Sequence, residues 1–258
     1  MNQPAAKEES FIIQGLAGTR ALSGRIPVRG SKNAALKALA SSLLFKDEVT
    51  IANVPEIEDI KRAVELLENL GASVMHPYAR ACAISFGKKI STELPSEIAH
   101  KLRASIVFTG PLLARVGNVS FPHPGGCLIG ARPIDLFVEG FKKMGARVHE
   151  EDGGYILDTP HGKLRGAEVF FKTPSVTGTE TLMMAAVLAR GTTVLKNAAM
   201  EPEIGALADF LNSSGAKIYG AGTAEITIKG TGLLSAKKSF QTPPDRIEAG
   251  SFLILAAL

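Results

Sequence analysis

Apolar and polar positions along the chain follow the same order three times. Each copy opens with a run that is apolar on nearly all sides, continues through a short strand and a loop, and reaches an amphipathic helix. A Gly-Ala step then leads into another strand. Repetition of this order predicts three copies of one structural unit. The copies lie in residues 33–74, 104–148 and 177–218.

The Gly-Ala steps set the spacing of the copies. They fall at Gly71, Gly145 and Gly215, and the intervals of 74 and 70 residues are nearly equal. Glycine at the end of a helix adopts a left-handed conformation without steric cost, so each step is expected to terminate a helix. The first helix of each copy, as in LKALASSLL or LMMAAVLA, has almost no polar face and is expected to be buried.

The last stretch of the chain, PDRIEAGSFLILAAL, resembles the start of a fourth copy. The pattern stops inside an apolar helix, before the strand that follows in the other copies. We therefore expect a truncation at residue 258. The side chains of Phe252, Leu253, Ile254 and Leu255 are expected to be exposed and to reduce solubility.

Composition is typical of a globular protein and excludes several other classes. Of 258 residues, 45% are hydrophobic and 21% are charged, which allows one large core or two smaller ones. No apolar run approaches the roughly 18 residues of a membrane-spanning helix, and the N-terminus lacks the apolar stretch of a secretory signal. These features predict a cytoplasmic protein.

Charge and cysteine content narrow the possible functions. A net charge of only +4, no Trp and three Tyr argue against a nucleic-acid binder, which needs basic side chains interleaved with aromatic ones. Cys82 and Cys127 are too few for a disulfide framework, and neither has the spacing of a zinc site. Both are expected to be reduced thiols, and no metal site is predicted.

The first candidate site is Gly30-Ser31-Lys32-Asn33, directly before an apolar helix. Free N–H groups at a helix start attract phosphate and carboxylate groups, and a lysine there adds positive charge. The spacing is not that of a Walker loop, because Ser31 separates Gly30 from Lys32. The alternative is an ordinary serine cap followed by a solvated lysine.

The second candidate is the stretch 124–136, in which glycines surround Cys127 and Arg132 follows five residues later. A glycine loop would present the thiol, and the arginine could lower the thiol pKa or bind a phosphate. The alternative is a small apolar cysteine in a turn. Cys82, within the strand-like ARACAISF, is expected to fill the core.

The third candidate comprises the starts of the other two buried helices. Arg103 precedes the second helix at the place that Lys32 occupies before the first, and residues 173–176 precede the third. If the units pack about a pseudo-threefold axis, the three helix starts meet at one end. They would then form one anion-binding face.

Together these stretches resemble the enolpyruvyl transferase family, and within it the members that act on UDP-N-acetylglucosamine in peptidoglycan synthesis. The resemblance covers essentially all of the chain after residue 10. The cysteine loop is its most specific part, because the related shikimate-pathway enzyme is not expected to carry it. The motifs are GSKNAAL at 30–36, LRASI at 102–106, PGGCLIGARPIDL at 124–136, PSVTGTETLMMAA at 174–186 and PDRIEAGSFL at 244–253.

The resemblance implies an α/β (α+β) fold, in which each lobe is an inside-out α/β barrel of three βαβαββ repeats. Residues 32–243 are expected to form one complete lobe. Residues 11–31 and 244–258 are expected to be a fragment of a second, similar lobe, and residues 1–10 a flexible N-terminus. The expected units of the complete lobe are about 32–100, 101–172 and 173–243.

The resemblance also implies a reaction, the transfer of the enolpyruvyl group from phosphoenolpyruvate to the 3-hydroxyl of UDP-N-acetylglucosamine with release of phosphate. It implies no metal and no organic cofactor. An acid must protonate the methylene carbon, a base must take the hydroxyl proton, and fixed positive charge must surround the phosphate. Because the family's base lies in the second lobe, this chain alone is expected to be inactive.

The family's site residues correspond to residues of this sequence that match its motifs. Cys127 resembles the catalytic cysteine, which acts as the acid or forms a covalent adduct with phosphoenolpyruvate. The residues implied to bind phosphoenolpyruvate are Lys32, Asn33, Arg103 and Arg132. The residues implied to bind the UDP-sugar are Asn33, Arg103, Arg132, Pro133, Ile134, Asp135, Leu136, Thr173, Pro174, Ser175 and Val176.

Two other functions stay open from the sequence. One is a shikimate-type enolpyruvyl transferase, against which PGGC and IGARPID argue. The other is a non-catalytic module that binds a nucleotide sugar and shares the repeat fold. Phosphate release with both substrates, compared with binding of the nucleotide sugar alone, discriminates between them.

Overall fold

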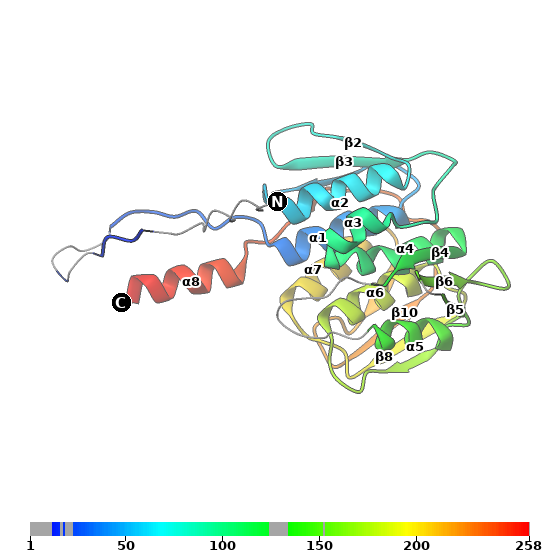
Figure 1. The fold of residues 1–258 in the computed structure, drawn as a ribbon. Helices are drawn as coiled ribbons and strands as arrows, with labels where there is room; N and C mark the ends of the chain where they lie inside the picture. The colour runs from blue at the N-terminus through cyan, green and yellow to red at the C-terminus, as the bar shows by residue number, and fades with distance from the viewer. Residues whose placement is uncertain (1–11, 16–17, 19–22, 124–133, 152, 258) are drawn as a thin grey trace, which may run out of the picture.

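Three units with the same order of elements make up most of the structure, a computed structural model (Figure 1). Each unit contains a buried helix, a strand, an amphipathic helix and a two-stranded hairpin. This order confirms the repeats and the mixed helix and strand class that the sequence predicted. The structure describes residues 12–15, 18, 23–123, 134–151 and 153–257.

The first unit begins with a helix that is buried over almost its whole length. From Ala34 to Ser41 every side chain is buried, including one charged side chain, that of Lys37. The amphipathic helix of this unit buries Ile60, Ala63 and Leu67, at the helical spacing seen in the sequence. The elements are α1 (Lys32–Ser41), the 3₁₀ helix η1 (Ser42–Leu44), β1 (Val49–Ala52), α2 (Glu58–Asn69), β2 (Ala72–Met75) and β3 (Ala81–Phe86).

The second unit has a short helix in front of its buried one, which begins with a 3₁₀ turn. The buried helix contains Pro111 and ends at Gly117, which has a φ of 89°. The elements are α3 (Ser96–Lys101), η2 (Arg103–Ser105), α4 (Ile106–Val116), β4 (Asn118–Pro122), α5 (Asp135–Lys143), β5 (Arg147–Glu151) and β6 (Gly154–Asp158).

The third unit is preceded and followed by single strands, and a last helix comes after it. As predicted, the three glycines of the Gly-Ala steps end the amphipathic helices, with φ of 97° at Gly71, 88° at Gly145 and 110° at Gly215. The elements are β7 (Glu168–Phe170), α6 (Val176–Val187), β8 (Thr192–Lys196), α7 (Pro202–Ser213), β9 (Lys217–Tyr219), β10 (Glu225–Lys229), β11 (Phe240–Gln241) and α8 (Arg246–Ala257).

Each unit's sheet receives backbone pairing from the segment that follows another unit. β7, which follows the second unit, pairs in parallel with β8 of the third. β11, which follows the third unit, pairs in parallel with β1 of the first. Between the first and second units the contact is a parallel bridge from Glu93 to Ser120 in β4. The units are therefore joined in a closed ring, with strand orders β11-β1-β3-β2, β4-β6-β5 and β7-β8-β10-β9.

Two asparagines strengthen this ring at matching places. Asn53 follows β1 and Asn197 follows β8, with φ of 54° and 55°, a conformation that asparagine tolerates better than most residues. Their side-chain amides donate to the carbonyls of Thr242, at 2.9 Å, and Phe171, at 2.8 Å. Each amide thus fixes the segment of the added strand next to its sheet.

The core of the ring consists of α1, α4 and α6, and the sheets lie toward the outside (Figure 1). The close approach of α4 and α6 depends on Gly110, because a Cβ there would lie 2.4 Å from the carbonyl oxygen of Thr181. α5 approaches α6 through Gly140 in the same way, against Leu182. Small residues therefore decide how closely the central helices pack.

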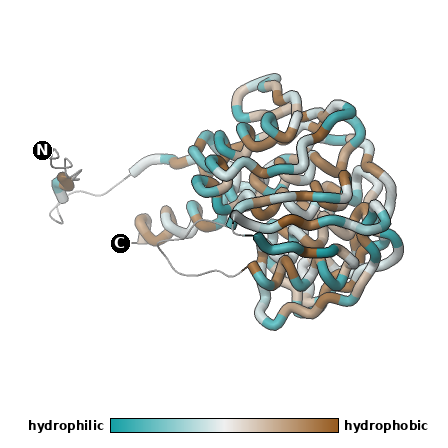
Figure 2. The backbone as a smooth tube through the Cα atoms, turned by 45° about the vertical axis from the view of Figure 1, so that its right-hand side comes forward, coloured by the Kyte–Doolittle hydropathy of each residue, from teal (hydrophilic) through white to brown (hydrophobic). Residues whose placement is uncertain are grey.

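The last helix, α8, stands apart from the body (Figure 1), and Figure 2 shows hydrophobic stretches along it. None of its described residues is buried. Leu253, Ile254 and Leu255 are exposed as predicted, whereas Phe252 is half-buried. No helix in the described part of the chain combines the length and apolarity needed to cross a membrane.

A buried ion pair joins α1 to α6. The Lys37 ammonium lies 3.1 Å from a carboxylate oxygen of Glu180, and the two side chains are 5% and 0% exposed. Burial raises the pKa of Glu180 to about 7, which outweighs the opposing effect of Lys37, and Glu203 and Glu201 raise it further.

The unfolding free energy of a Glu180→Gln variant, relative to that of the unmodified chain, is expected to increase as the pH rises from 4.5 toward 7. In this range the unfolded chain has lost the Glu180 proton and the folded chain still holds it, so the stability of the unmodified chain falls with rising pH. The full effect corresponds to about 3 kcal/mol.

Urea denaturation of both proteins at pH 5, 6, 7 and 8 measures this difference in unfolding free energy. A difference that stays constant over the four pH values would contradict the raised pKa.

Candidate active site

The starts of α1, α4 and α6 lie at the same end of the core. At the other end of α4, the Arg115 guanidinium donates to the carbonyls of Leu43 and Phe45, both at 2.8 Å, so α4 and α1 run in the same direction. The Lys37–Glu180 pair joins α1 and α6 within about two turns of their first residues. The helix starts that the sequence marked in three separate stretches are thus neighbours in space.

Serine side chains cap two of these helix starts. Ser31 Oγ accepts from the Ala34 amide at 3.4 Å, and Ser175 Oγ accepts from the Gly178 amide at 3.1 Å. Each cap satisfies one of the four free N–H groups of a helix start, and the others are available to an anion. The start of α4 differs, because η2 and its residue Arg103 stand there instead of a capping side chain.

Lys32 is the first residue of α1, and its ammonium bonds Asp59 at 2.9 Å. The two side chains are 47% and 39% exposed. An ion pair exposed to this extent contributes little to stability, so a phosphate group could replace the carboxylate at small cost. Next to it, Asn33 is half-buried.

Arg103 is half-buried in η2, between α3 and α4. Its position at the start of α4 matches that of Lys32 at the start of α1, as the repeat alignment predicted. The structure therefore provides a cation at the start of two of the three central helices.

One of the two stretches implied to bind the UDP-sugar contacts the helix that begins at the end of the other. Leu136, near the start of α5, packs on Gly178 in the first turn of α6, where an added Cβ would lie 2.4 Å from Leu136 Cδ1. Ile134 beside it is buried, and Asp135 is exposed at the start of α5. Of the other stretch, Thr173 and Pro174 are exposed, whereas Ser175 and Val176 are half-buried.

Cys127, Arg132 and Pro133 lie outside the described residues. Aromatic side chains lie just before this stretch, at the end of β4. The Phe121 and Tyr155 rings stack at 5.4 Å, and His123 meets Tyr155 edge-on at 4.9 Å. This stacking joins β4 and β6 where the described chain reaches residue 123.

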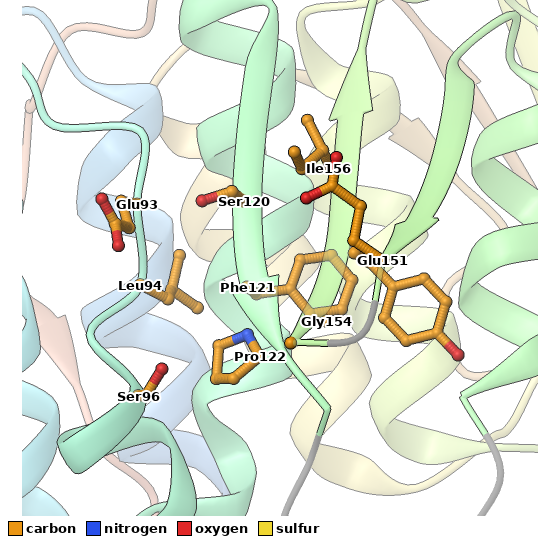
Figure 3. A pocket seen from close by; sticks show the side chains of 11 residues that line it. Glu93, Leu94, Ser96, Ser120, Phe121, Pro122, Glu151, Gly154 and Ile156 are labelled. Carbon is orange, nitrogen blue, oxygen red and sulfur yellow. The ribbon is translucent and has the colours of Figure 1, made fainter.

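Two hollows in the described surface are lined by residues other than the expected site residues. The smaller, of about 160 Å³, lies where Glu93 pairs with β4. Figure 3 shows Glu93, Leu94 and Ser96 on one side of it and Ser120 and Pro122 on the other. The larger, of about 540 Å³, lies along α2 and contacts the hairpin of β2 and β3.

Cys82 borders the larger hollow but is itself buried, with 3% exposure, as expected for a core residue. Burial raises the pKa of its thiol. Its Sγ lies 3.8 Å from Nδ1 of His76, the nearest polar partner. Among the described residues, no group of three or more His, Cys, Asp or Glu is arranged to hold a metal ion.

Sequence reasoning missed the buried charges next to this site. Lys37 and Glu180 each stand inside a helix that is otherwise apolar, in NAALKALAS and TGTETLMMAA. A charged residue on a helix face that is expected to be buried needs a partner of opposite charge. This was the feature of the sequence that could have revealed the pair.

The EPSP synthase (3-phosphoshikimate 1-carboxyvinyltransferase) family matches residues 16–258 of the chain. A UDP-N-acetylglucosamine 1-carboxyvinyltransferase of Idiomarina loihiensis is 45% identical over 93% of the chain. One of Desulfatibacillum aliphaticivorans is 48% identical over 93% of the chain. The chain spans 57% of the length of each of these two relatives.

Solved structures share the fold at low identity. The enolpyruvyl transferase NikO from Streptomyces tendae matches with a TM-score of 0.79 at 20% identity, covering 92% of this chain and 55% of that one. EPSP synthase from Acinetobacter baumannii matches with a TM-score of 0.72 at 17% identity, covering 90% of this chain and 52% of that one. These likenesses support the fold class alone.

Alanine at Gly178 is expected to cost about 1 kcal/mol of unfolding free energy, because the new methyl group must displace Leu136. Gly205 is the matched control. It also lies within a helix, α7, but a Cβ there meets open space, so Gly205→Ala should stabilise by up to about 1 kcal/mol. Chemical denaturation of the two variants tests the contact, and equal effects would refute it.

Alkylation of the native chain by iodoacetamide is expected to label Cys127 and to spare Cys82. The Cys82 thiol is buried and its pKa is raised, so little reactive thiolate reaches the reagent. Peptide mapping before and after denaturation measures both sites, and Cys127→Ser provides the control. Rapid labelling of Cys82 in the native variant would contradict the prediction.

Proposed function

The chain belongs to the EPSP synthase family, and from this we propose that it is part of an enolpyruvyl transferase that acts on UDP-N-acetylglucosamine. The reaction transfers the enolpyruvyl group of phosphoenolpyruvate to the sugar 3-hydroxyl and releases phosphate. Two relatives with this name, at 45% and 48% identity, support the acceptor, as does the cysteine loop PGGC at 124–127. The reaction belongs to peptidoglycan synthesis, and we place it in the cytoplasm.

One observation carries the proposal: the starts of α1, α4 and α6 lie together, with Lys32 at the first and Arg103 before the second. Phosphoenolpyruvate carries a phosphate and the UDP-sugar carries a diphosphate, so the binding site of each substrate must hold a negatively charged group. Helix starts with free N–H groups and nearby cations supply the positive potential that such groups need. Compact cations also stabilise the charge that develops on the departing phosphate.

The proposed roles follow from these positions. Lys32 exchanges Asp59 for the phosphoenolpyruvate phosphate, and Arg103 and Arg132 complete the cationic site. Cys127 is the proposed acid or covalent nucleophile toward phosphoenolpyruvate. The contact of Leu136 with Gly178 holds together the segments 133–136 and 173–176, which we propose as the walls of the UDP-sugar site together with Asn33.

We further propose that residues 32–243 form one lobe and that residues 11–31 and 244–258, which include α8, belong to a second. The apolar, unburied surface of α8 and the partial coverage of the relatives support this division. The site then lies between lobes, and a base from the second takes the proton of the sugar hydroxyl. Activity is therefore tested on a protein that contains both lobes, called here the full-length protein. The 258-residue chain alone is expected to release no phosphate.

The full-length protein is expected to release phosphate from phosphoenolpyruvate with UDP-N-acetylglucosamine and not with shikimate 3-phosphate. Lys32→Ala should lower kcat/KM at least about 30-fold, because loss of a charge-assisted contact costs ~2–5 kcal/mol. Lys217→Ala, which removes an exposed lysine on β9, is the matched control and should act like the unmodified protein.

A colorimetric phosphate assay measures these rates. Release with shikimate 3-phosphate would favour the alternative transferase. Binding of UDP-N-acetylglucosamine without any phosphate release would favour the non-catalytic module.

A further inference from the structure

The Lys37–Glu180 pair sits directly behind the helix starts that carry the proposed site. Lys37 lies five residues after Lys32 in α1, and Glu180 lies five residues after the capping Ser175 of α6. Each is therefore about 7 Å along its helix from a residue that faces the site end. The separation of 3.1 Å between their charged groups links the two helices at equal depth.

Stability does not explain why these two charges are buried. Glu180 is fully buried, neither of its carboxylate oxygens has a partner with hydrogen-bond geometry in the described structure, and its pKa is raised by burial. Apolar residues of similar volume generally serve a core at least as well as a buried ion pair. A charge pair at such a position is better explained by the relative position of the two helices that it holds.

The surroundings of Glu180 come from three elements. Lys37 faces it from α1, and the carboxylates of Glu201 and Glu203 act on it from the start of α7. Glu203 is itself buried and is paired with Arg246 of α8 at 3.2 Å. Among the described residues, Lys37 is the cation that pairs with the buried Glu180, and it ties the first turns of α6 to α1 by charge when Glu180 is ionised.

We propose that Lys37 and Glu180 are a positioning pair, which sets the spacing of α1 and α6 and thereby aligns Lys32 and Asn33 with residues 173–176 for binding the nucleotide sugar. This inference rests on the proposed function for the identity of the ligand. Slippage of one helix along the other would move one half of the site relative to the other. An apolar contact would permit such slippage, whereas a single buried charge pair has one favourable register.

The test uses the full-length protein with three variants. Lys37→Met with Glu180→Met replaces both charges by apolar side chains of similar length. Lys37→Glu with Glu180→Lys reverses the pair and keeps a charged link. At pH 8, above the pKa of about 7 at Glu180, Glu180→Gln removes one charge with almost no change of shape, and it is the variant that retains the fold if either double variant is insoluble.

Calorimetric affinity for UDP-N-acetylglucosamine at pH 8, where Glu180 is ionised, is the main measurement, together with KM and kcat. We expect the double methionine variant to be at least as stable as the unmodified protein and yet to bind about 10-fold more weakly, with KM raised more than kcat is lowered. Glu180→Gln should bind about as weakly. The reversed pair should recover most of the affinity. Unchanged affinity in the double methionine variant or in Glu180→Gln would overturn the proposal.

Amide hydrogen exchange separates this inference from the proposed function. In the double methionine variant and in Glu180→Gln, exchange should become about 10-fold faster in the first two turns of α1 and α6 and stay unchanged in β8 and β10. If the unmodified protein binds no nucleotide sugar, the proposed function fails, and faster exchange at these turns would still support the positioning role. Unchanged exchange there would overturn it.

Discussion

The structure depends on the burial of three helices that have almost no polar face. α1, α4 and α6 cannot satisfy this requirement within their own units, since each unit offers only one amphipathic helix and one sheet to cover them. They are buried by packing on one another, with glycine at the closest approach of α4 and α6. The ring holds them there because β11 returns to β1, and Asn53 reinforces this closure by donating across 189 residues to Thr242.

The same constraint produces the candidate site. Helices that pack in one core with a common direction present their starts at one end, where unpaired N–H groups collect. Lys32, Arg103 and Ser175 stand at these starts because the repeats place them at corresponding positions of each unit. Anion binding in this protein therefore arises from the ends of its most buried elements. The apolar core and the polar site are two consequences of one packing arrangement.

The units have diverged where this arrangement matters most. Asn53 and Asn197 occupy corresponding positions after β1 and β8, whereas the second unit has His123 there, in edge-on contact with Tyr155. In the described part of the chain, a buried ion pair likewise joins the first and third units, through Lys37 and Glu180. In the described residues, these departures from threefold similarity thus lie next to the candidate site. Functional sites are where a protein is expected to depart from the regular pattern of its repeats.

The sequence by itself determined the units, because hydrophobic period and helix-ending glycines are local properties. It also determined which side chains carry candidate chemistry, since GSKN and LRAS mark helix starts before any packing is known. Only the tertiary structure decided that Leu136 meets Gly178, that Lys32 bonds Asp59, and that Lys37 faces Glu180. These contacts join residues from different elements, and most join different units. Their geometry follows from the crossing of helices in the closed ring, which no local pattern specifies.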